Sequence, residues 1–413
     1  MKKSHKPFHK TLGASHLAGR ANGFTLVEIL VGLIIGLIGV LIIFQVFAVS
    51  EGQKRTTTSG SDAQQSGTFS LYTLERSIRS AGQNIMTTNH PDEAPILLGC
   101  NTRAFNGVAF TTFPMVPVLI TSANNGTSDT ITIMSGSASG NSNPVNLTAP
   151  APAGGSDTGV LSVSNVFGFN SGATTGDFFI TMESGRVRPL VNCTIARVTA
   201  VTPNVAVVAP TVPAGAGTVT RQFGAGPTAS AYNAAFTVSY TKDATVLNLG
   251  ANPTFTQYSV VYAAATNQST LQANDLLGRT APAVLAENIV NLQAQYGVDT
   301  NNDGTIDSWQ PATAAWAAGA ITRQQITQIK AIRVGIVARS GLLEKVNPTT
   351  NACNATPAAP MPLPAVAGTN PAKPAGPAMS VAALPANWQC YRYKAYETVI
   401  PVRNAVMSAV KAL

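Results

Sequence analysis

The segment from Asp299 to Gln310, which reads DTNNDGTIDSWQ, has the residue types and spacing of a calcium-binding loop. Oxygen-bearing residues alternate at its start, Gly304 supplies a tight turn, and an acid stands at the ninth position, as in the loop of an EF-hand. The candidate ligands are Asp299, Asn301, Asp303, Thr305 through its backbone carbonyl, and Asp307. These residues predict a Ca²⁺ site with a structural role.

Two features of this segment leave a second interpretation open. Gln310 stands where an EF-hand loop usually has a bidentate glutamate, and no pair of long helices is evident on either side. The affinity should therefore be weak, although sites with dissociation constants of about 10⁻⁴ to 10⁻³ M can fill outside cells. The alternative is a hairpin turn without a metal, because Asp, Asn and Gly tolerate the backbone angles of tight turns.

The four cysteines, Cys100, Cys193, Cys353 and Cys390, form a second informative set. An even number suits two disulfides in an oxidising compartment, and four cysteines allow three pairings. Proximity in the sequence favours Cys353 with Cys390 and Cys100 with Cys193. The first pair would tether residues 354–389, which contain eight prolines and many alanines and cannot bury much core. Zinc is the rival interpretation, but the sequence has no CxxC pair and few histidines.

Catalytic chemistry finds little support in the sequence. Three of the four histidines fall within residues 1–23, which leaves His90 in a proline-flanked segment where we expect a surface loop. A Ser-His-Asp or Cys-His arrangement would depend on His90 alone. The sequence also has no glycine-rich phosphate loop followed by a lysine. We therefore expect a protein that is not an enzyme.

Residues 24–49 form an apolar span whose one charged side chain is Glu28. A helix of this length rises far enough to cross a bilayer of about 30 Å. A carboxylate inside a membrane is costly, so Glu28 is a functional candidate that should find a cationic partner. Gly32 and Gly36 have the spacing that lets membrane helices approach closely, or they only loosen the helix.

The residues before this span are basic. Residues 1–23 hold five Lys and Arg and no acid, so they carry most of the net charge of +8 and leave +3 on the rest. Under the positive-inside rule this segment stays in the cytoplasm and everything after Val49 lies outside it. An ordinary secretory signal is cut after its apolar region, and no convincing small-residue site follows Val49. The modest remaining charge, without a Lys/Arg cluster, argues against nucleic-acid binding.

The elements that position these residues can be inferred from periodicity. Residues 50–82 predict an amphipathic extension of the helix, with a Glu75–Arg79 pair and an end near Gly82. Its apolar stripe comprises Phe69 or Leu71, Leu74 and Ile78.

After Gly82 the composition favours a β-rich body. Short β-branched or aromatic runs predict strands at 129–134, 177–182, 236–240, 257–263 and 329–337. Small residues, Gly and Pro predict loops at 135–159 and 203–226. Residues 283–296 fit neither a helical nor a strand period, and the length allows one elaborated head or two sub-domains.

The start of the chain resembles the processing site of type IV pilins and of type II secretion pseudopilins. The resemblance is carried by GFTLVE, Gly23 to Glu28, between a basic leader and an apolar span. It implies cleavage by a prepilin peptidase between Gly23 and Phe24, with methylation of the new amino group. It also implies that Glu28 acts in assembly.

Later segments resemble the PilW family of type IV pilus minor pilins. They are LERSIRSAG (74–82), IRVGIVARS (332–340) and YRYKAYETVIPVRN (391–404). The resemblance implies an α+β fold with a long N-terminal helix, membrane-spanning and then amphipathic, packed on a β-sheet-rich head over residues 83–413. It implies an inner-membrane protein with a periplasmic head that later joins the pilus. The implied partners are other minor pilins, the major pilin, the prepilin peptidase and the inner-membrane assembly machinery.

Three other functions remain open at this point. A plain transmembrane anchor would not need the combination of Gly23, Phe24, Thr25, Leu26 and Glu28. A minor pseudopilin of a type II secretion system shares the start motif, so the motif does not separate it from a pilin. A pilus-tip adhesin would explain the large, loop-rich body.

Overall fold

The computed structural model describes residues 23–86, 97–138, 143–183, 192–203, 216–224, 226–344, 346, 349–350, 353, 355–382 and 384–408. The expectations for the leader of residues 1–22 and for His90 lie outside these ranges. The chain divides into two compact units, Met1–Arg55 and Thr56–Leu413. Helix α1 (Leu26–Ser80) begins in the first unit and ends in the second.

The first unit contains the apolar part of α1. Residues Leu26–Lys54 have a mean hydropathy of 3.0, and none of this stretch is buried. Within the described residues it is the one helix that is long and apolar enough to cross a membrane. Large apolar side chains are exposed all round this part of the helix, as expected for a segment that a membrane would solvate.

In the second unit, α1 buries one stripe against the β-sheets. Leu74 and Ile78 are fully buried and Leu71 packs at the edge of the same core, whereas Phe69 is 51% exposed. Phe69 lies five residues before Leu74, which at about 100° per residue places it well away from the stripe. The predicted pair also forms, with Arg79 Nε donating to Glu75 Oε1 over 2.9 Å. The helix ends at Ser80, and Gly82 follows with φ +82°, a conformation that glycine adopts without strain.

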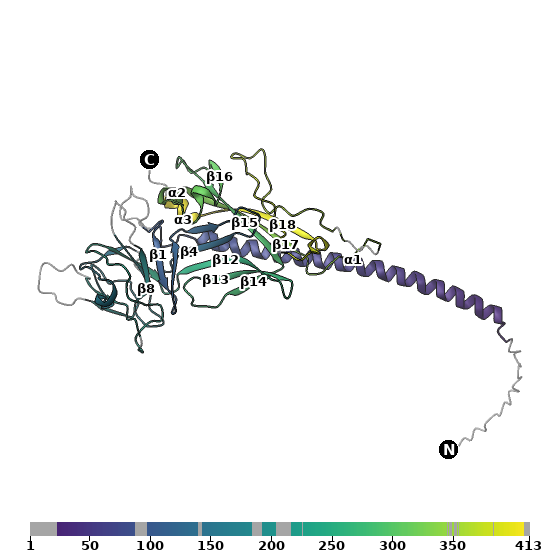
Figure 1. Ribbon diagram of the computed structural model, residues 1–413, viewed down its shortest axis with the longest axis horizontal. Helices are drawn as coiled ribbons and strands as arrows, with labels where there is room; N and C mark the ends of the chain where they lie inside the picture. Colours follow the sequence, from purple (N-terminus) through teal and green to yellow (C-terminus); the bar gives the residue numbers. More distant parts are fainter. Residues whose placement is uncertain are drawn as a thin grey trace, which may run out of the picture. The chain divides into compact units, whose positions relative to one another are not determined.

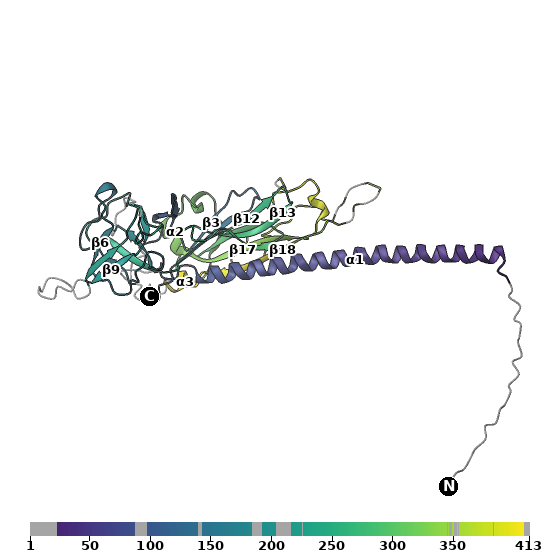
Figure 2. The same cartoon turned by 90° about the horizontal axis from the view of Figure 1, so that it is seen from below.

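Two antiparallel sheets lie beside this part of α1 (Figures 1 and 2). The five-stranded sheet has the order β14-β13-β12-β4-β3, and the four-stranded sheet has the order β16-β15-β17-β18. Their strands are β3 (Val118–Thr121), β4 (Thr130–Ser135), β12 (Thr254–Ala263), β13 (Gln268–Asp275), β14 (Ala283–Glu287), β15 (Ile289–Val298), β16 (Ser308–Pro311), β17 (Ile329–Arg339) and β18 (Tyr393–Pro401). All residues of β15 and β17 are buried, so this strand pair forms the centre of the core that the stripe of α1 covers.

Two further sheets are built mainly from the segment between β1 and β11. A six-stranded sheet has the order β2-β1-β8-β7-β11-β5, and a three-stranded sheet has the order β6-β10-β9. Their strands are β1 (Asn101–Phe105), β2 (Phe110–Pro114), β5 (Val145–Asn146), β6 (Val160–Val163), β7 (Phe178–Met182), β8 (Cys193–Arg197), β9 (Ala200–Pro203), β10 (Gly217–Thr220) and β11 (Thr245–Gly250). The pair β1 and β8 is parallel, whereas the other strand pairs in these two sheets are antiparallel.

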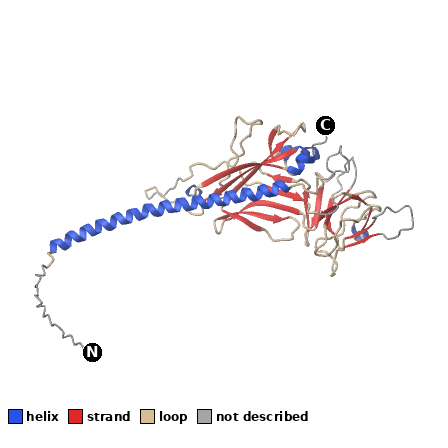
Figure 3. Ribbon diagram, turned by 180° about the vertical axis from the view of Figure 1, so that it is seen from behind, coloured by secondary structure: helices blue, strands red, loops and turns tan. Residues whose placement is uncertain are grey.

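Short helices occupy the connections, and strands predominate after α1 (Figure 3). They are η1 (Gly154–Ser156), η2 (Ala314–Trp316), α2 (Arg323–Gln328), η3 (Trp388–Cys390) and α3 (Arg403–Ser408). The predicted α+β architecture, with a long N-terminal helix and a sheet-rich head, is therefore confirmed. The described residues from Thr56 onward belong to one compact unit.

Several local predictions need correction. The run at 236–240 is not a strand, because Phe236 N donates to Asp157 Oδ2 and only Tyr240 forms an isolated bridge, to Ala151. Phe236 and Tyr240 are buried all the same, so the apolar alternation reflects core filling by a loop. The predicted loops also contain short strands, β5 and β10. Residues 283–296 form two strands that are separated by Asn288, whose φ of +60° breaks the period.

Gly67 tests the contact between α1 and the four-stranded sheet. A Cβ atom at Gly67 would lie 2.3 Å from Cε2 of Tyr396, whereas a Cβ at Gly60, two turns earlier on the same face, would meet nothing within 4 Å. We expect Gly67→Leu to lower the free energy of unfolding by about 1 to 3 kcal/mol, the usual cost of overpacking. Gly60→Leu should be neutral or slightly stabilising, because leucine is the better helix former. Thermal unfolding of both variants in detergent measures the difference, and equal midpoints would contradict the proposed close packing.

Candidate functional site

The first candidate site is the start of α1. Gly23, Phe24 and Thr25 lie outside the helix, which begins at Leu26. The Thr25 hydroxyl accepts a hydrogen bond from Glu28 N over 3.3 Å, and Glu28 N also donates to the Thr25 carbonyl over 3.0 Å. Thr25 is therefore the N-cap and Glu28 occupies the N3 position, where a negative charge is favourable at the positive end of the helix dipole.

Sequence reasoning missed this capping role. The spacing Thr-x-x-Glu before an apolar run is a capping-box signature, which could have identified both residues. Glu28 is exposed, as are the apolar residues around it. A Cβ at Gly32, Gly36 or Gly39 would meet nothing within 4 Å, so the role of these glycines in helix association stays a prediction.

The second candidate site is the loop that joins β15 to β16. Asp299 is fully buried, and its Oδ2 accepts a hydrogen bond from Gly304 N over 3.0 Å. Asp303 Oδ1 accepts from Thr305 N over 2.8 Å, and Asp307 Oδ2 accepts from Thr300 N over 2.7 Å. Within the described parts of the chain, no three His, Cys, Asp or Glu side chains form a group that could hold a metal ion. Calcium binding therefore stays a prediction.

The two exposed acids of this loop stay ionised readily. Hydrogen bonds from Thr305 lower the pKa of Asp303, and hydrogen bonds from Thr300 lower the pKa of Asp307. Asn301 belongs to the same network, because its Oδ1 accepts from Asp303 N and its Nδ2 donates to Asp303 Oδ2, both over 3.0 Å. Hydrogen bonds thus join three of the predicted ligands, Asn301, Asp303 and Thr305, whereas Asp307 bonds to Thr300.

The cysteines form the two disulfides that sequence proximity favoured. Cys100 bonds to Cys193 with a Cα–Cα separation of 6.1 Å, and Cys353 bonds to Cys390 with a separation of 5.0 Å. The first joins the segment before β1 to the first residue of β8, beside the parallel pairing of these two strands. The second closes the Pro/Ala-rich segment of residues 354–389.

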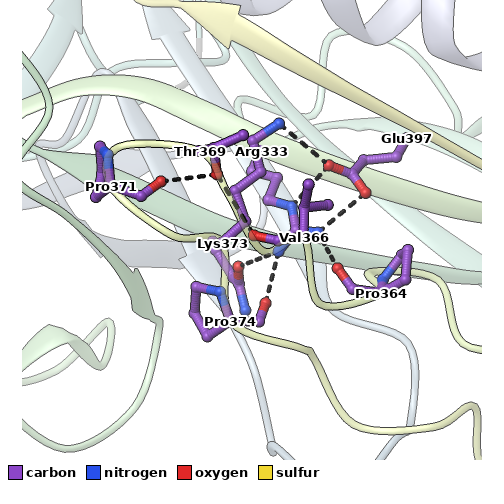
Figure 4. Close-up of polar contacts among 9 residues, drawn as sticks. Arg333, Pro364, Val366, Thr369, Pro371, Lys373, Pro374 and Glu397 are labelled. Carbon is purple, nitrogen blue, oxygen red and sulfur yellow. Dashed lines mark hydrogen bonds and ion pairs between the residues drawn. The ribbon is translucent and has the colours of Figure 1, made fainter.

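A buried arginine holds this Pro/Ala-rich segment against the four-stranded sheet (Figure 4). Arg333, in the middle of β17, has no exposed surface and forms a bidentate ion pair with Glu397 of β18, at 2.8 and 2.9 Å. Its remaining N–H groups donate to Gln295 Oε1 and to the carbonyls of Pro364 and Pro374. All five guanidinium donors are therefore used, which is what a buried charge requires.

Sequence reasoning did not find this arginine, although a signal was present. Arg333 interrupts the apolar run from Ala331 to Ala338, and Glu397 is the one acid in the strand-like segment near the end of the chain. A charge within a buried strand indicates an ion pair with an opposite charge elsewhere in the chain. Lys373 adds a second cation to the same carboxylate, with its Nζ 3.6 Å from Glu397 Oε1.

These features define the class of protein. A helix that is apolar all round in its first part and striped in its second, followed by antiparallel sheets, is the α+β architecture of a pilin-like subunit. The family model of the prokaryotic N-terminal methylation motif matches residues 19–44, which include Gly23, Phe24 and Glu28.

The second match is more specific. The family model described as type IV pilus-assembly protein W, PilW, matches residues 257–404. This segment runs from β12 into α3 and contains the Asp299 loop, Arg333 and the Cys353–Cys390 disulfide. The predicted resemblance to the PilW family is confirmed, and the chain is a pilin-like protein related to type IV pili. Both matched families are structural, and no curated protein and no solved structure matches the chain.

Replacing Arg333 tests whether its ion pair holds the head together. Arg333→Met leaves Glu397 without its main partner, so we expect a loss of about 3 to 5 kcal/mol in the free energy of unfolding. Arg392→Met is the matched control, because Arg392 is 51% exposed and pairs with Glu344 at the surface. That change should cost about 1 kcal/mol or less. Urea unfolding in detergent compares the two, and a similar small loss for both would show that the buried pair is unimportant.

Proposed function

We propose that this protein is a minor pilin that primes the assembly of a type IV pilus or caps it. The observation that carries the proposal is the order of two features in one chain. A prepilin-type motif overlaps the start of α1, and the PilW-matching segment supplies most of the strands whose core the other end of α1 joins. A subunit of this construction can connect a membrane-embedded helix to a folded head outside the membrane.

In the proposed mechanism the prepilin peptidase cuts after Gly23 and methylates the amino group of Phe24. The scissile bond lies before the helix, and the helix begins two residues later at Leu26. The basic leader stays in the cytoplasm, so the head faces the periplasm while the inner membrane holds residues 24–49. During assembly the same apolar surface moves from lipid into the core of the filament.

Glu28 has two functions in this proposal. Within its own subunit it stands in the first turn of α1, where Thr25 caps the helix. In the filament its carboxylate pairs with the α-amino group of a neighbouring subunit. A buried ion pair of this kind is better suited to fixing the register between subunits than to adding stability.

The partners follow from this route. The chain would meet the prepilin peptidase first, then the inner-membrane assembly machinery, and then other minor pilins and the major pilin. The experiment that tests the function is recovery of pilin in the sheared surface fraction from a strain that lacks this chain, with and without complementation. Loss of surface pili that complementation restores supports priming. Unchanged pili together with defective release of folded proteins would identify a minor pseudopilin instead.

One observation favours an additional surface role. The described strands β1 to β11 lie outside both matched segments, and they include every strand of the six-stranded and three-stranded sheets. A pilus-tip adhesin would place its binding surface there. Normal piliation with reduced attachment to host or abiotic surfaces, after substitutions confined to exposed residues of this part, would support the adhesin.

Substitution of Glu28 separates its two functions. Glu28→Ala removes both the charge and the polar side chain at the N3 position, whereas Glu28→Gln keeps a side chain that suits this position and removes only the charge. If the ion pair matters, both variants should be processed and inserted normally. Both should then fall by about tenfold or more in sheared pili, because an unpaired buried amino group is costly.

The control for this experiment is Glu51→Gln, which removes a charge from the same helix well after its first turn. This variant should enter pili at the parental level. Immunoblots of membrane and sheared fractions provide the measurement. Normal incorporation of Glu28→Gln together with failure of Glu28→Ala would show that capping, and not pairing between subunits, is the role of Glu28.

A further inference from the structure

We propose that the loop from Asp299 to Asp307 binds a calcium ion, which clamps the hairpin of β15 and β16. The evidence lies in the buried end of the loop. Asp299 has no exposed surface, and its Oδ1 atom is buried without a hydrogen-bond partner. A buried carboxylate oxygen without a partner normally requires a cation or a hydrogen-bond donor.

The second carboxylate oxygen of Asp299 fixes the direction of the side chain. Oδ2 accepts a hydrogen bond from Gly304 N, five residues further along the same loop. The carboxylate therefore points across the loop that it begins. Asn302 and Gly304 have φ values of +59° and +89°, so the backbone folds tightly around it. In a calcium loop a glycine at the sixth position makes this sharp turn.

Both ends of the loop are anchored before any metal binds. Asp299 N donates to the Gln328 carbonyl over 2.9 Å, and Asp307 N donates to the Val298 carbonyl over 2.8 Å. Gly297, at the end of β15, lies under the ring of Trp309 from β16. These contacts fix the base of the hairpin, so the loss of conformational freedom on binding would be confined to the loop.

The other ligands are acidic, amide and carbonyl oxygens, which suit a hard cation that accepts flexible geometry. Asp303 and Asp307 are exposed and are held only by hydrogen bonds from Thr305, Asn301 and Thr300 within the loop. A cation can displace these donors by small rotations of the side chains. The proposed set is Asp299, Asn301, Asp303 and Asp307 through their side chains, and Thr305 through its carbonyl.

The positive charge of Lys330 lies near Asp299 and would repel a bound cation. Lys330 is buried, its Nζ donates to the Thr327 carbonyl over 2.8 Å, and its charge interacts with that of Asp299. Three carboxylates nevertheless leave the loop with a net negative charge beside this single lysine.

Gln310, in β16, donates to Ser308 Oγ over 3.1 Å and does not supply the bidentate carboxylate of tighter loops. The site should therefore be weak, with a dissociation constant of about 10⁻⁴ to 10⁻³ M.

Terbium luminescence tests this site in the full-length protein in detergent. Tb³⁺ takes oxygen ligands as Ca²⁺ does, and the indole of Trp309 follows Asp307 by two residues and can sensitise its emission. We expect saturable emission that Ca²⁺ lowers only when present in excess over its own dissociation constant, because trivalent Tb³⁺ binds more tightly. Mg²⁺ should lower the emission much less, because Mg²⁺ requires a stricter geometry. Calcium should also raise the midpoint of thermal unfolding, and a chelator should reverse the shift.

Asp303→Asn and Asp307→Asn are the informative variants, because both side chains are exposed and the fold does not depend on them. Each should weaken calcium binding by about tenfold or more, since affinity follows the number of charged ligands. Asp62→Asn, on an exposed face of α1, removes the same charge elsewhere and should bind as the parent does.

The proposal is overturned if calcium at about 10 mM, well above the expected constant, neither displaces Tb³⁺ nor raises the midpoint of thermal unfolding. It is also overturned if Asp303→Asn and Asp307→Asn bind calcium as tightly as the parent. The titration uses purified protein and needs no pilus, so failure here would leave the proposed role in pilus assembly untouched.

Discussion

The contact between one face of α1 and the two central sheets is the constraint on which the rest of the head depends. A single continuous helix is apolar on every side over residues 26–49 and buries only a stripe after residue 60. Leu74 and Ile78 enter a core that includes residues of both the five-stranded and the four-stranded sheet. Removing that stripe would uncover the part of this shared core that faces the helix, so α1 completes a core to which both sheets contribute.

Polar contacts and a disulfide stabilise residues 354–389, which have few large apolar side chains of their own. The Pro/Ala-rich segment before β18 contributes few large side chains, among them Leu363 and Met379, which are buried. Arg333 binds two of its carbonyls, and the Cys353–Cys390 disulfide closes it near its ends. The Pro/Ala-rich segment is thus held by Arg333 of the adjacent sheet and by a disulfide, because it cannot form a core of its own.

The sequence was most informative where one physical effect dominates. Hydrophobicity alone identified the membrane-type span, strong β-branched runs identified β4, β7, β12 and β17, and proximity selected the disulfide pairs. It was least informative where tertiary contacts decide the conformation. Phe236 and Tyr240 alternate like a strand but fill a core from a loop, and the partners of Arg333 come from three separate parts of the chain. The burial of Asp299 also follows from the docking of its loop beside Gln328, which local spacing does not reveal.

The capped start of α1 has an electrostatic consequence for a subunit that waits in the membrane. Cleavage at the proposed bond would create a charged amine at Phe24, next to a helix end that already carries about half a positive charge. Glu28 follows this amine by four residues and lies in the same first turn as the unpaired amides. One carboxylate thus offsets both positive sources within a single chain. On entry into a filament, Glu28 would exchange the amino group of its own subunit for that of a neighbouring subunit. The charges would then be compensated both in the membrane and in the filament.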